Sequence, residues 1–352
     1  MSWRDNVRRV VPYVPGEQPK ENNIIKLNTN ENPYPPAPGV REALAGFDYA
    51  ELRKYPDPAV TDLVHALASR FEVGDDQVFV GVGSDDVIAM SFMTFFNSDK
   101  PIIFPDITYS FYDVWAEEFR IPYVTKALDE NFHVLLEDYR GENGGVVLPN
   151  PNAPTGISEG LAFYEEIIRS NPDSVVIIDE AYVDFGAESA VPLIDKYDNL
   201  LVVQTFSKSR SLAGSRIGYA IGQPELIKCL NDVKYSFNSY TMDRITIKLG
   251  VESVLDEAYF KEQVARIIKT REWSKKRLSE LGFTFGDSLA NFIFAAHPDV
   301  PASYIFDELK KCGIYVRYFR KPRIDNYLRI TIGTDEEMEK LMAELERIVK
   351  NA

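Results

Sequence analysis

The sequence predicts an α/β protein in two parts: a mostly parallel mixed sheet flanked by helices, followed by a smaller α+β region. Between residues 77 and 221, short apolar runs alternate with stretches of helical periodicity, which is typical of a sheet covered on both faces. A long helical stretch at residues 255–281 separates this region from three further strand-like runs. The chain of 352 residues is also longer than one hydrophobic core usually extends.

The first part begins with an irregular segment, rich in proline and asparagine, that contains one short strand at residues 24–27. Asp57 as N-cap and Pro58 at the first position predict a helix that runs to Phe71. The pattern then predicts strands at residues 77–82, 101–104, 146–148, 174–178, 200–204 and 219–221. It predicts helices at residues 84–96, 111–119 and 159–170.

The second part is predicted to be smaller, with a last helix that carries the capping box Thr334 to Glu337. Its last strand alternates Arg329 with apolar residues, so we expect the arginine on the exposed face of that strand. Its three strands are expected at residues 291–294, 313–316 and 328–332. We expect residues 1–40 to form an arm on the small domain, residues 41–260 the large domain and residues 261–352 the small domain.

The charge of the chain excludes several classes of partner. A net charge of −15 is opposite to the basic surface that nucleic acids and anionic membranes require. No apolar run is as long as a membrane span, and the first residues lack the apolar core of a signal peptide. The two cysteines have no zinc or disulfide spacing, so we expect reduced thiols in a cytoplasmic protein, and no metal site.

One basic cluster stands out from this acidic background. Its members are Arg317, Arg320, Lys321, Arg323 and Arg329. Such a cluster is most often a solvated surface, and the alternative is a binding site for a small anionic substrate.

Lys208 lies in the stretch of the sequence that gives the strongest indication of a functional site, residues 200–222. A buried strand at residues 200–203 ends in a hydroxyl-rich loop, and Arg216 follows before the next strand. Open α/β sheets bind their ligands at such strand ends. A partly buried lysine amine has a lowered pKa and can attack carbonyl groups. The pattern therefore indicates a lysine that forms a Schiff base.

Four other stretches also follow predicted strands. The small-residue turn at residues 81–86 opens a helix whose backbone N–H groups suit a phosphate. Asp179 follows four apolar residues, where a carboxylate must be paired or hydrogen-bonded. The other two stretches are the Pro/Asn turn at residues 149–156 and the pair Thr108–Tyr109, in which the tyrosine offers a flat ring for stacking.

Together these residues suit pyridoxal phosphate, which needs a lysine, a carboxylate, donors to its phenolate, a flat neighbour and an anion site. Lys208 would bind its aldehyde and Asp179 its pyridinium nitrogen. Tyr182 and Asn152 would donate to the phenolate, and Tyr109 would lie on the ring. The phosphate site would consist of Gly83, Ser84, Asp85, Thr205, Ser207 and Arg216.

The sequence resembles the fold-type I pyridoxal-phosphate-dependent aminotransferases, and among them the histidinol-phosphate aminotransferase family. The resemblance rests on the motifs LNTNENPYPP, RKYPDP, GSDD, PDITYSFY, PNPNAPTG, IIDEAYVDF, TFSKSRSLAGSRIGY and YLRITIGT, in the family's order over residues 28–334. One residue departs from the family pattern, because Ala153 stands where the family has an asparagine that bonds the phenolate. Either Asn152 takes that role or Tyr182 fills it alone.

The resemblance implies a homodimer that moves an amino group between L-histidinol phosphate and 2-oxoglutarate, giving imidazole acetol phosphate and glutamate, in histidine biosynthesis. It implies that Lys208 carries the Schiff base and moves a proton, and that Asp179 and Tyr182 assist it. Tyr55 would reach the cofactor phosphate of the neighbouring subunit, and Arg329 would clamp the substrate carboxylate. Further substrate contacts would come from Arg317, Arg320, Arg323, Tyr13, Asn30 and Asn32.

Other functions remain open at this point. An aromatic amino-acid aminotransferase would use the same scaffold, and so would a decarboxylase of a phosphorylated amino acid, which needs no oxo-acid partner. A non-catalytic ligand-binding module would have no need of Lys208. A nucleotide-binding protein would need phosphate-loop residues that the turn at residues 81–86 lacks.

Overall fold

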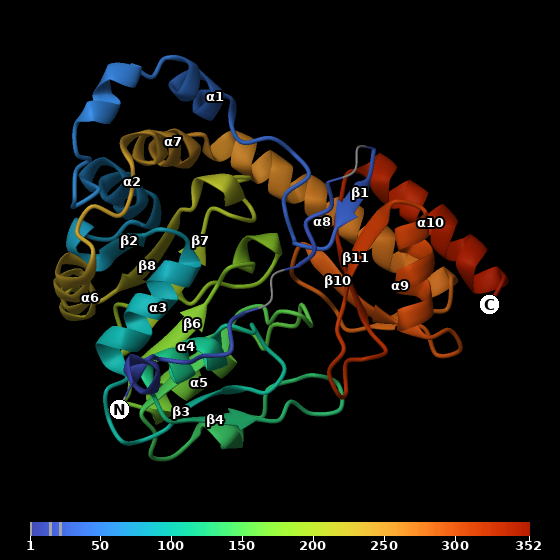
Figure 1. Ribbon diagram of the computed structural model, residues 1–352, viewed down its shortest axis with the longest axis horizontal. Coiled ribbons are helices and arrows are strands. Elements are labelled where there is room, and N and C mark those ends of the chain that lie inside the picture. Colours follow the sequence, from blue (N-terminus) through green and yellow to red (C-terminus); the bar gives the residue numbers. More distant parts are fainter. Residues whose placement is uncertain (1, 14–15, 21–22) are drawn as a thin grey trace.

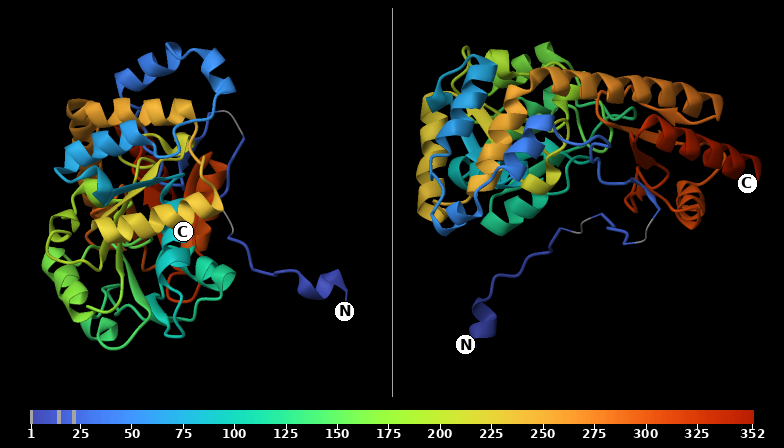
Figure 2. Two further views of the ribbon diagram at one scale, coloured as in Figure 1. Left: turned by 90° about the vertical axis from the view of Figure 1, so that its left-hand side faces the viewer. Right: turned by 90° about the horizontal axis from the view of Figure 1, so that it is seen from above.

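The computed structural model describes residues 2–13, 16–20 and 23–352 and contains two sheets connected by one long helix (Figure 1). Within the described residues, the larger sheet has seven strands in the order β2-β8-β7-β6-β5-β3-β4. The smaller sheet has five strands in the order β1-β11-β12-β10-β9. The connecting helix α8, Glu257–Glu280, is about 36 Å long, enough to run from one sheet to the other (Figure 2).

The larger sheet is mixed and mostly parallel, as predicted. Its strands β3 to β7 run parallel to one another, and β8 runs antiparallel to both of its neighbours. The carboxyl ends of the parallel strands therefore lie along one edge. The bounds are β2 Val78–Gly81, β3 Ile102–Pro105, β4 Tyr123–Lys126, β5 Gly145–Pro149, β6 Val176–Asp179, β7 Leu200–Thr205 and β8 Gly218–Gly222.

The central strands are apolar without alternation because helices cover both faces of the sheet. On β6, Val176 and Ile178 pack in one cluster with α2, α5 and α7, whereas Ile177 packs in another with α3, α4 and α6. The bounds of the helices around this sheet are α1 Pro38–Ala45, α2 Thr61–Phe71, α3 Ser84–Phe95, α4 Tyr112–Phe119, α5 Leu161–Ser170, α6 Pro224–Phe237 and α7 Arg244–Leu255.

The smaller sheet has its own core and is mainly antiparallel. Its last helix, α10, begins with the predicted capping box between Thr334 and Glu337. The first strand of the chain, β1, joins this sheet by pairing in parallel with β11. The bounds are β1 Ile25–Leu27, β9 Thr284–Phe285, β10 Phe292–Ala296, β11 Ile314–Tyr318, β12 Leu328–Thr331, α9 Ala302–Lys311 and α10 Asp335–Lys350.

The arm is divided between the two parts of the molecule rather than packed on the smaller part alone. Its strand β1 lies in the smaller sheet, but Tyr13 stacks on Phe111 beside α4, with the ring centroids 4.2 Å apart. Arg8 forms an ion pair with Glu118 of α4 at 3.8 Å. The residues nearest the N-terminus extend away from the body (Figure 2). The stacking of Tyr13 on Phe111 therefore holds this part of the arm against the larger part of the molecule, beside α4.

One predicted helix starts later than expected. Val60 adopts a left-handed conformation with φ of 54°, so α2 begins at Thr61 and not at Pro58. Asp57 still acts at this end, because its carboxylate accepts the N–H of Thr61 at 2.8 Å. Apart from the short 3-10 helices, the helices and strands without a predicted counterpart are α1, α6, α7, α9, β4 and β9. Of these, β4 and β9 are short strands at sheet edges, where the pattern is weak.

Within the described parts of the chain, none of the helices combines the length and the apolar character that a membrane span needs.

Candidate active site

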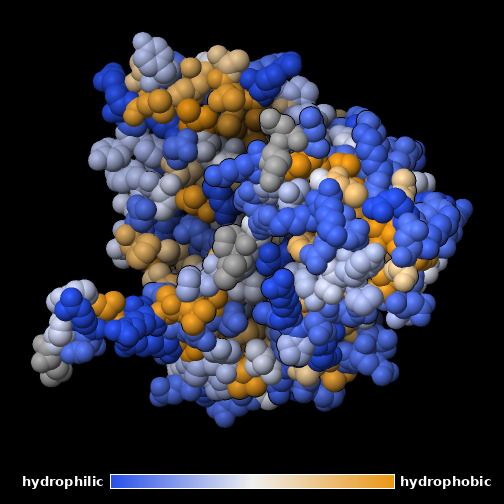
Figure 3. Space-filling model, turned by 45° about the vertical axis from the view of Figure 1, so that its right-hand side comes forward, coloured by the Kyte–Doolittle hydropathy of each residue, from blue (hydrophilic) through white to orange (hydrophobic). Residues whose placement is uncertain are grey.

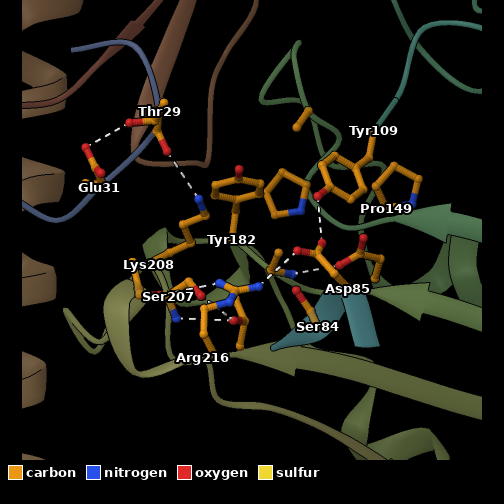
Figure 4. Close-up of a pocket in the computed structure, with 16 residues that line it drawn as sticks. Thr29, Glu31, Ser84, Asp85, Tyr109, Pro149, Tyr182, Ser207, Lys208 and Arg216 are labelled. Carbon is orange, nitrogen blue, oxygen red and sulfur yellow. Dashed lines mark hydrogen bonds and ion pairs between the residues drawn. The ribbon is translucent and has the colours of Figure 1, made fainter. Parts of the chain in front are cut away.

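A pocket opens beside the carboxyl ends of β5, β6 and β7, where the sequence predicts a ligand (Figure 4). Because these strands are parallel neighbours, their polar end residues meet although they are far apart in the sequence. The pocket is lined by Thr29, Glu31, Ser84, Asp85, Tyr109, Pro149, Pro151, Ala153, Asp179, Ala181, Tyr182, Thr205, Ser207, Lys208, Ala213 and Arg216.

Lys208 lies three residues after the end of β7 and points its amine into the pocket (Figure 4). The Nζ atom donates to the carbonyl of Thr29 at 3.3 Å and lies 5.6 Å from the ring centroid of Tyr182. Asn32 fixes the backbone of the lysine loop, since its Nδ2 donates to the carbonyls of Lys208 and Ser209 at 3.1 and 3.2 Å. The arm thus holds this lysine from both its backbone and its amine.

Asp179 ends β6 and is buried in the floor of the pocket. Burial raises the pKa of its carboxyl to about 6, although the hydroxyl of Tyr112, which donates to Oδ2 at 2.6 Å, works against this rise. The carboxylate is therefore largely ionised at neutral pH and suits a cation in the pocket. Tyr112 was not among the predicted site residues. The signal for it is its position three residues after Tyr109, on the first turn of α4.

The opposite end of the pocket suits an anion. Arg216 donates to Asp85 Oδ2 at 3.0 Å, and the hydroxyl of Tyr109 donates to Asp85 Oδ1 at 2.7 Å (Figure 4). The helix α3 begins here at Ser84, and its first N–H groups have no partner within the helix. Gly83 has φ of 88°, and a Cβ at this position would lie 2.5 Å from the Arg216 guanidinium. Only glycine therefore permits this close contact.

Two hydroxyl residues at the end of β7 complete the anion end of the pocket. Thr205 Oγ1 accepts the backbone N–H of Ser207 at 3.2 Å and lies 3.0 Å from its hydroxyl oxygen. Both side chains line the pocket beside Lys208 and Arg216. The residues predicted for a phosphate thus lie together in the structure.

Asn152 and Tyr182, the two candidates for the phenolate, have different surroundings. The amide of Asn152 is buried and used at both ends, because Nδ2 donates to the carbonyl of Ile107 and Oδ1 accepts the hydroxyl of Thr108, each at 2.9 Å. It supports the loop that carries Tyr109 and does not line the pocket, whereas Tyr182 does. The next residue, Ala153, lines the pocket with a methyl group that cannot form hydrogen bonds.

Arg329 leaves the core of the smaller sheet, as predicted, but it does not lie on an exposed face. The arm and the ring of Phe292 cover it: Nη2 donates to the carbonyl of Asn28 at 3.0 Å, and the ring centroid is 5.4 Å from Cζ. Its Nε is buried without a partner among the described residues. Burial lowers the pKa of the guanidinium, and the positive charge of Arg317, its neighbour across β11 and β12, lowers it further.

Two other members of the basic cluster, Arg323 and Arg320, have different surroundings. Arg323 donates to Asp106 at 2.9 Å and to the carbonyls of Leu128 and Asp129 at 2.7 and 2.9 Å, so contacts with the larger part occupy its guanidinium. We therefore leave Arg323 out of the proposed site. Arg320 is exposed. These cations are close together in the sequence, but the chain changes direction between β11 and β12, so Arg323 and Arg329 contact different parts of the molecule.

Tyr55 and Tyr13 both lie outside the pocket lining of their own chain. Tyr55 is 79% exposed and lies against Tyr240 in a tilted arrangement, with the ring centroids 4.8 Å apart. Tyr13 lies on Phe111, whose ring is a neighbour of Tyr109 at 5.6 Å between centroids. Asn30 lies beside the pocket, where its Nδ2 donates to the hydroxyl of Tyr182 at 2.9 Å.

The family profile described as aminotransferase class I and II matches residues 22–345 of the sequence. The chain belongs to this aminotransferase family. Among its relatives, the histidinol-phosphate aminotransferase of Clostridium beijerinckii is 50% identical over 349 residues, which cover 99% of this chain and 98% of the relative. The enzyme of the same name from Acinetobacter baumannii strain SDF is 53% identical over 348 residues, with 98% and 96% covered.

Solved structures agree with the assignment of this chain to the aminotransferase family. The histidinol-phosphate aminotransferase of Sinorhizobium meliloti, determined in complex with pyridoxal-5'-phosphate, is 25% identical. It superposes with a TM-score of 0.84 over 93% of this chain and 91% of its own. The fold is also shared with the enzyme from Clostridium acetobutylicum, at a TM-score of 0.84 and 22% identity.

Proposed function

We propose that this aminotransferase binds pyridoxal phosphate and transfers an amino group between L-histidinol phosphate and 2-oxoglutarate, as a step of histidine biosynthesis in the cytoplasm. The observation that carries the proposal is one pocket with a lysine amine, a buried carboxylate and an arginine beside a helix N-terminus. The names of the full-length relatives at about 50% identity support the choice of substrate.

The pocket residues fit the cofactor group by group. Lys208 would hold its aldehyde, Asp179 its pyridinium nitrogen and Tyr182 its phenolate oxygen, while Tyr109 would lie on the ring. The orphaned N–H groups at the start of α3, which include that of Asp85, would bind the phosphate together with the side chains of Ser84, Ser207 and Arg216. When bound, pyridoxal phosphate supplies an electron sink for the charge that develops on the substrate carbon.

The chain's own residues do the acid–base work of the transfer. The Lys208 amine is the basic group in the pocket lining that can carry a proton to and from the substrate carbon. The buried Asp179 carboxylate would stabilise a positive charge on the ring nitrogen of the bound cofactor. The Tyr182 hydroxyl, which also lines the pocket, would orient the ring by donating to its oxygen.

Arg329 and Arg317 suit a substrate anion. The Nε of Arg329 is buried and has no hydrogen-bond partner among the described residues, so an anion that reached it would gain a charge-assisted hydrogen bond. A phosphate in one half-reaction and a carboxylate in the other can use the same fork of donors. Arg317 lies directly across the ladder from it and adds a second positive charge.

We expect kcat/KM for histidinol phosphate to exceed that for histidinol by a few orders of magnitude, with 2-oxoglutarate as the acceptor. Each hydrogen bond to a charged group contributes roughly 1.5–3 kcal/mol, and the phosphate offers at least two. The measurement is a panel of donors that includes histidinol phosphate, histidinol, phenylalanine and tyrosine. Arg329→Lys should reduce this preference, because an ammonium cannot make the bidentate contact.

The same panel separates the alternatives. An aromatic amino-acid aminotransferase would prefer phenylalanine or tyrosine and would gain nothing from the phosphate. A decarboxylase would release carbon dioxide and consume no 2-oxoglutarate. Equal rates for histidinol and histidinol phosphate would rule out the proposed substrate while leaving the cofactor chemistry in place.

We also propose that the enzyme is a homodimer in which Tyr55 reaches the cofactor phosphate of the partner. Tyr55 is exposed and outside its own pocket, which suits a role in a neighbouring one. Apolar surface extends along the upper edge of the face in Figure 3. Large apolar side chains are exposed in the single chain on α1, on η2 (Tyr49–Arg53) and at the end of α7. A second subunit that covered this surface would remove them from water: Leu44, Tyr49, Leu52 and Leu255.

Mixing two inactive variants, Tyr55→Phe and Lys208→Ala, should restore part of the activity. In a hybrid dimer with shared sites, one site carries both defects and the other carries neither. The measurement is activity after mixing and subunit exchange, with a sedimentation experiment for the mass. If Tyr55 acts within its own subunit, each site keeps one defect and the mixture stays inactive.

A further inference from the structure

The hydroxyl of Tyr182 can serve the cofactor only if its hydrogen points into the pocket. Tyr182 has one hydrogen to donate and can also accept. The neighbouring lining residues Pro149, Pro151 and Ala153 offer no side-chain donor. Asn152 is occupied elsewhere. The direction of this single hydroxyl hydrogen is therefore important for the bound phenolate.

A chain of hydrogen bonds through Asn30 fixes that direction. The backbone N–H of Asn30 can only donate, and it does so to Thr331 Oγ1 at 3.1 Å. The Thr331 hydroxyl in turn donates to Asn30 Oδ1 at 3.0 Å, so the oxygen of this amide faces Thr331. The amide nitrogen then faces Tyr182 and donates to its hydroxyl oxygen at 2.9 Å. With the amide reversed, the Thr331 hydrogen would lose this acceptor.

Asn30 is held firmly enough to act in this way. It is 1% exposed and has φ of 57°, a left-handed conformation that asparagine tolerates better than most residues. Its carbonyl accepts from Nδ2 of Asn291 at 3.0 Å. Backbone and side chain are thus both anchored to the smaller part of the molecule, while the amide nitrogen reaches the larger part.

We propose that Asn30 is a positioning residue that turns the Tyr182 hydroxyl into a donor to the cofactor phenolate, in compensation for the asparagine replaced by Ala153. The proposal rests on the proposed cofactor. It also gives Asn30 a role other than the substrate contact expected from the sequence. Thr331 and Arg329 lie two residues apart on β12, so they share one face of the strand. The proposed anion site at Arg329 and the orientation of the Tyr182 hydroxyl therefore depend on the same strand.

The test is the pH dependence of the visible absorbance of the holoenzyme, which reports the ionisation of the Schiff-base nitrogen beside the phenolate. A donor to the phenolate draws negative charge away from that nitrogen, so losing the donor should raise the apparent pKa. We expect Tyr182→Phe to raise it by about one pH unit. Asn30→Asp should have a similar effect, because a carboxylate accepts the Tyr182 hydrogen and turns it away from the pocket.

The double variant separates this role from the effect of an added charge. If Asn30 acts through the Tyr182 hydroxyl, most of the shift caused by Asn30→Asp disappears in the Tyr182→Phe background. Equal shifts in the two backgrounds, or no shift in either, would overturn the proposal.

Two milder variants keep the test open if Asn30→Asp does not fold. Asn30→Gly keeps the left-handed backbone and removes the amide, and Thr331→Val removes the hydroxyl that orients it. Each should give a smaller shift in the same direction, and an unchanged pKa in both would contradict the proposal. A wild-type protein without a cofactor absorbance band would overturn the proposed function and this inference together, whereas a normal band with unshifted variants overturns this inference alone.

Discussion

Lys208→Ala is expected to lose turnover by about 10⁴-fold or more while the protein still binds pyridoxal phosphate. The loss is large because one side chain supplies both the covalent attachment and the proton carrier. Binding should persist because the phosphate donors around Arg216 and the Asp179 carboxylate remain in place. Borohydride reduction of the wild type, followed by peptide mass analysis, should find the cofactor on the peptide that contains Lys208.

The matched control is Lys196→Ala, which removes an exposed lysine of the same large part of the molecule. It should keep both the label and the activity. A label on another peptide in the wild type, or a Lys208→Ala protein with substantial turnover, would contradict the assignment of this lysine.

Asp179→Asn is expected to lower activity by roughly 10²–10⁴-fold, because it leaves a buried ring cation unpaired at a cost of about 3–5 kcal/mol.

The carboxyl group of Asp179 also makes cofactor binding depend on pH. Burial raises the pKa of Asp179 to about 6, so the ionised form that attracts the cation is present above this pH and is lost as pH falls through it. We therefore expect apoenzyme affinity for the cofactor to weaken below about pH 6.

Tyr112→Phe should move this midpoint to higher pH by about one to two units, since it removes a hydrogen bond to the ionised carboxylate worth roughly 1.5–3 kcal/mol. The measurement is a cofactor titration of the apoenzyme between pH 5 and pH 8 for wild type and both variants. The cofactor's own ionisation is common to all three curves, so their differences belong to the chain. Coincident wild-type and Tyr112→Phe curves would show that Tyr112 does not control Asp179.

Sequence patterns were enough to predict six of the seven strands of the larger sheet, the edge at which the site lies and the residues that follow each predicted strand. Periodicity is a local property, so it was enough to predict β5, β6 and β7, and their parallel order brings the ends together. Asp179 is the last residue of β6 and Lys208 lies three residues after the end of β7, and the structure places both in one pocket. The capping box of α10 was likewise evident from four consecutive residues.

The directions of the polar side chains near the site could not be predicted in the same way, because they depend on tertiary packing. Asn152 turns to the loop after β3, and Tyr112 reaches Asp179 across 67 residues of sequence. Asn30 meets Tyr182 across 152 residues. Arg323 and Arg329 are six positions apart, yet one binds the larger part and the other lies under the arm. Such contacts depend on how separate elements approach one another in space, and no local propensity encodes that approach.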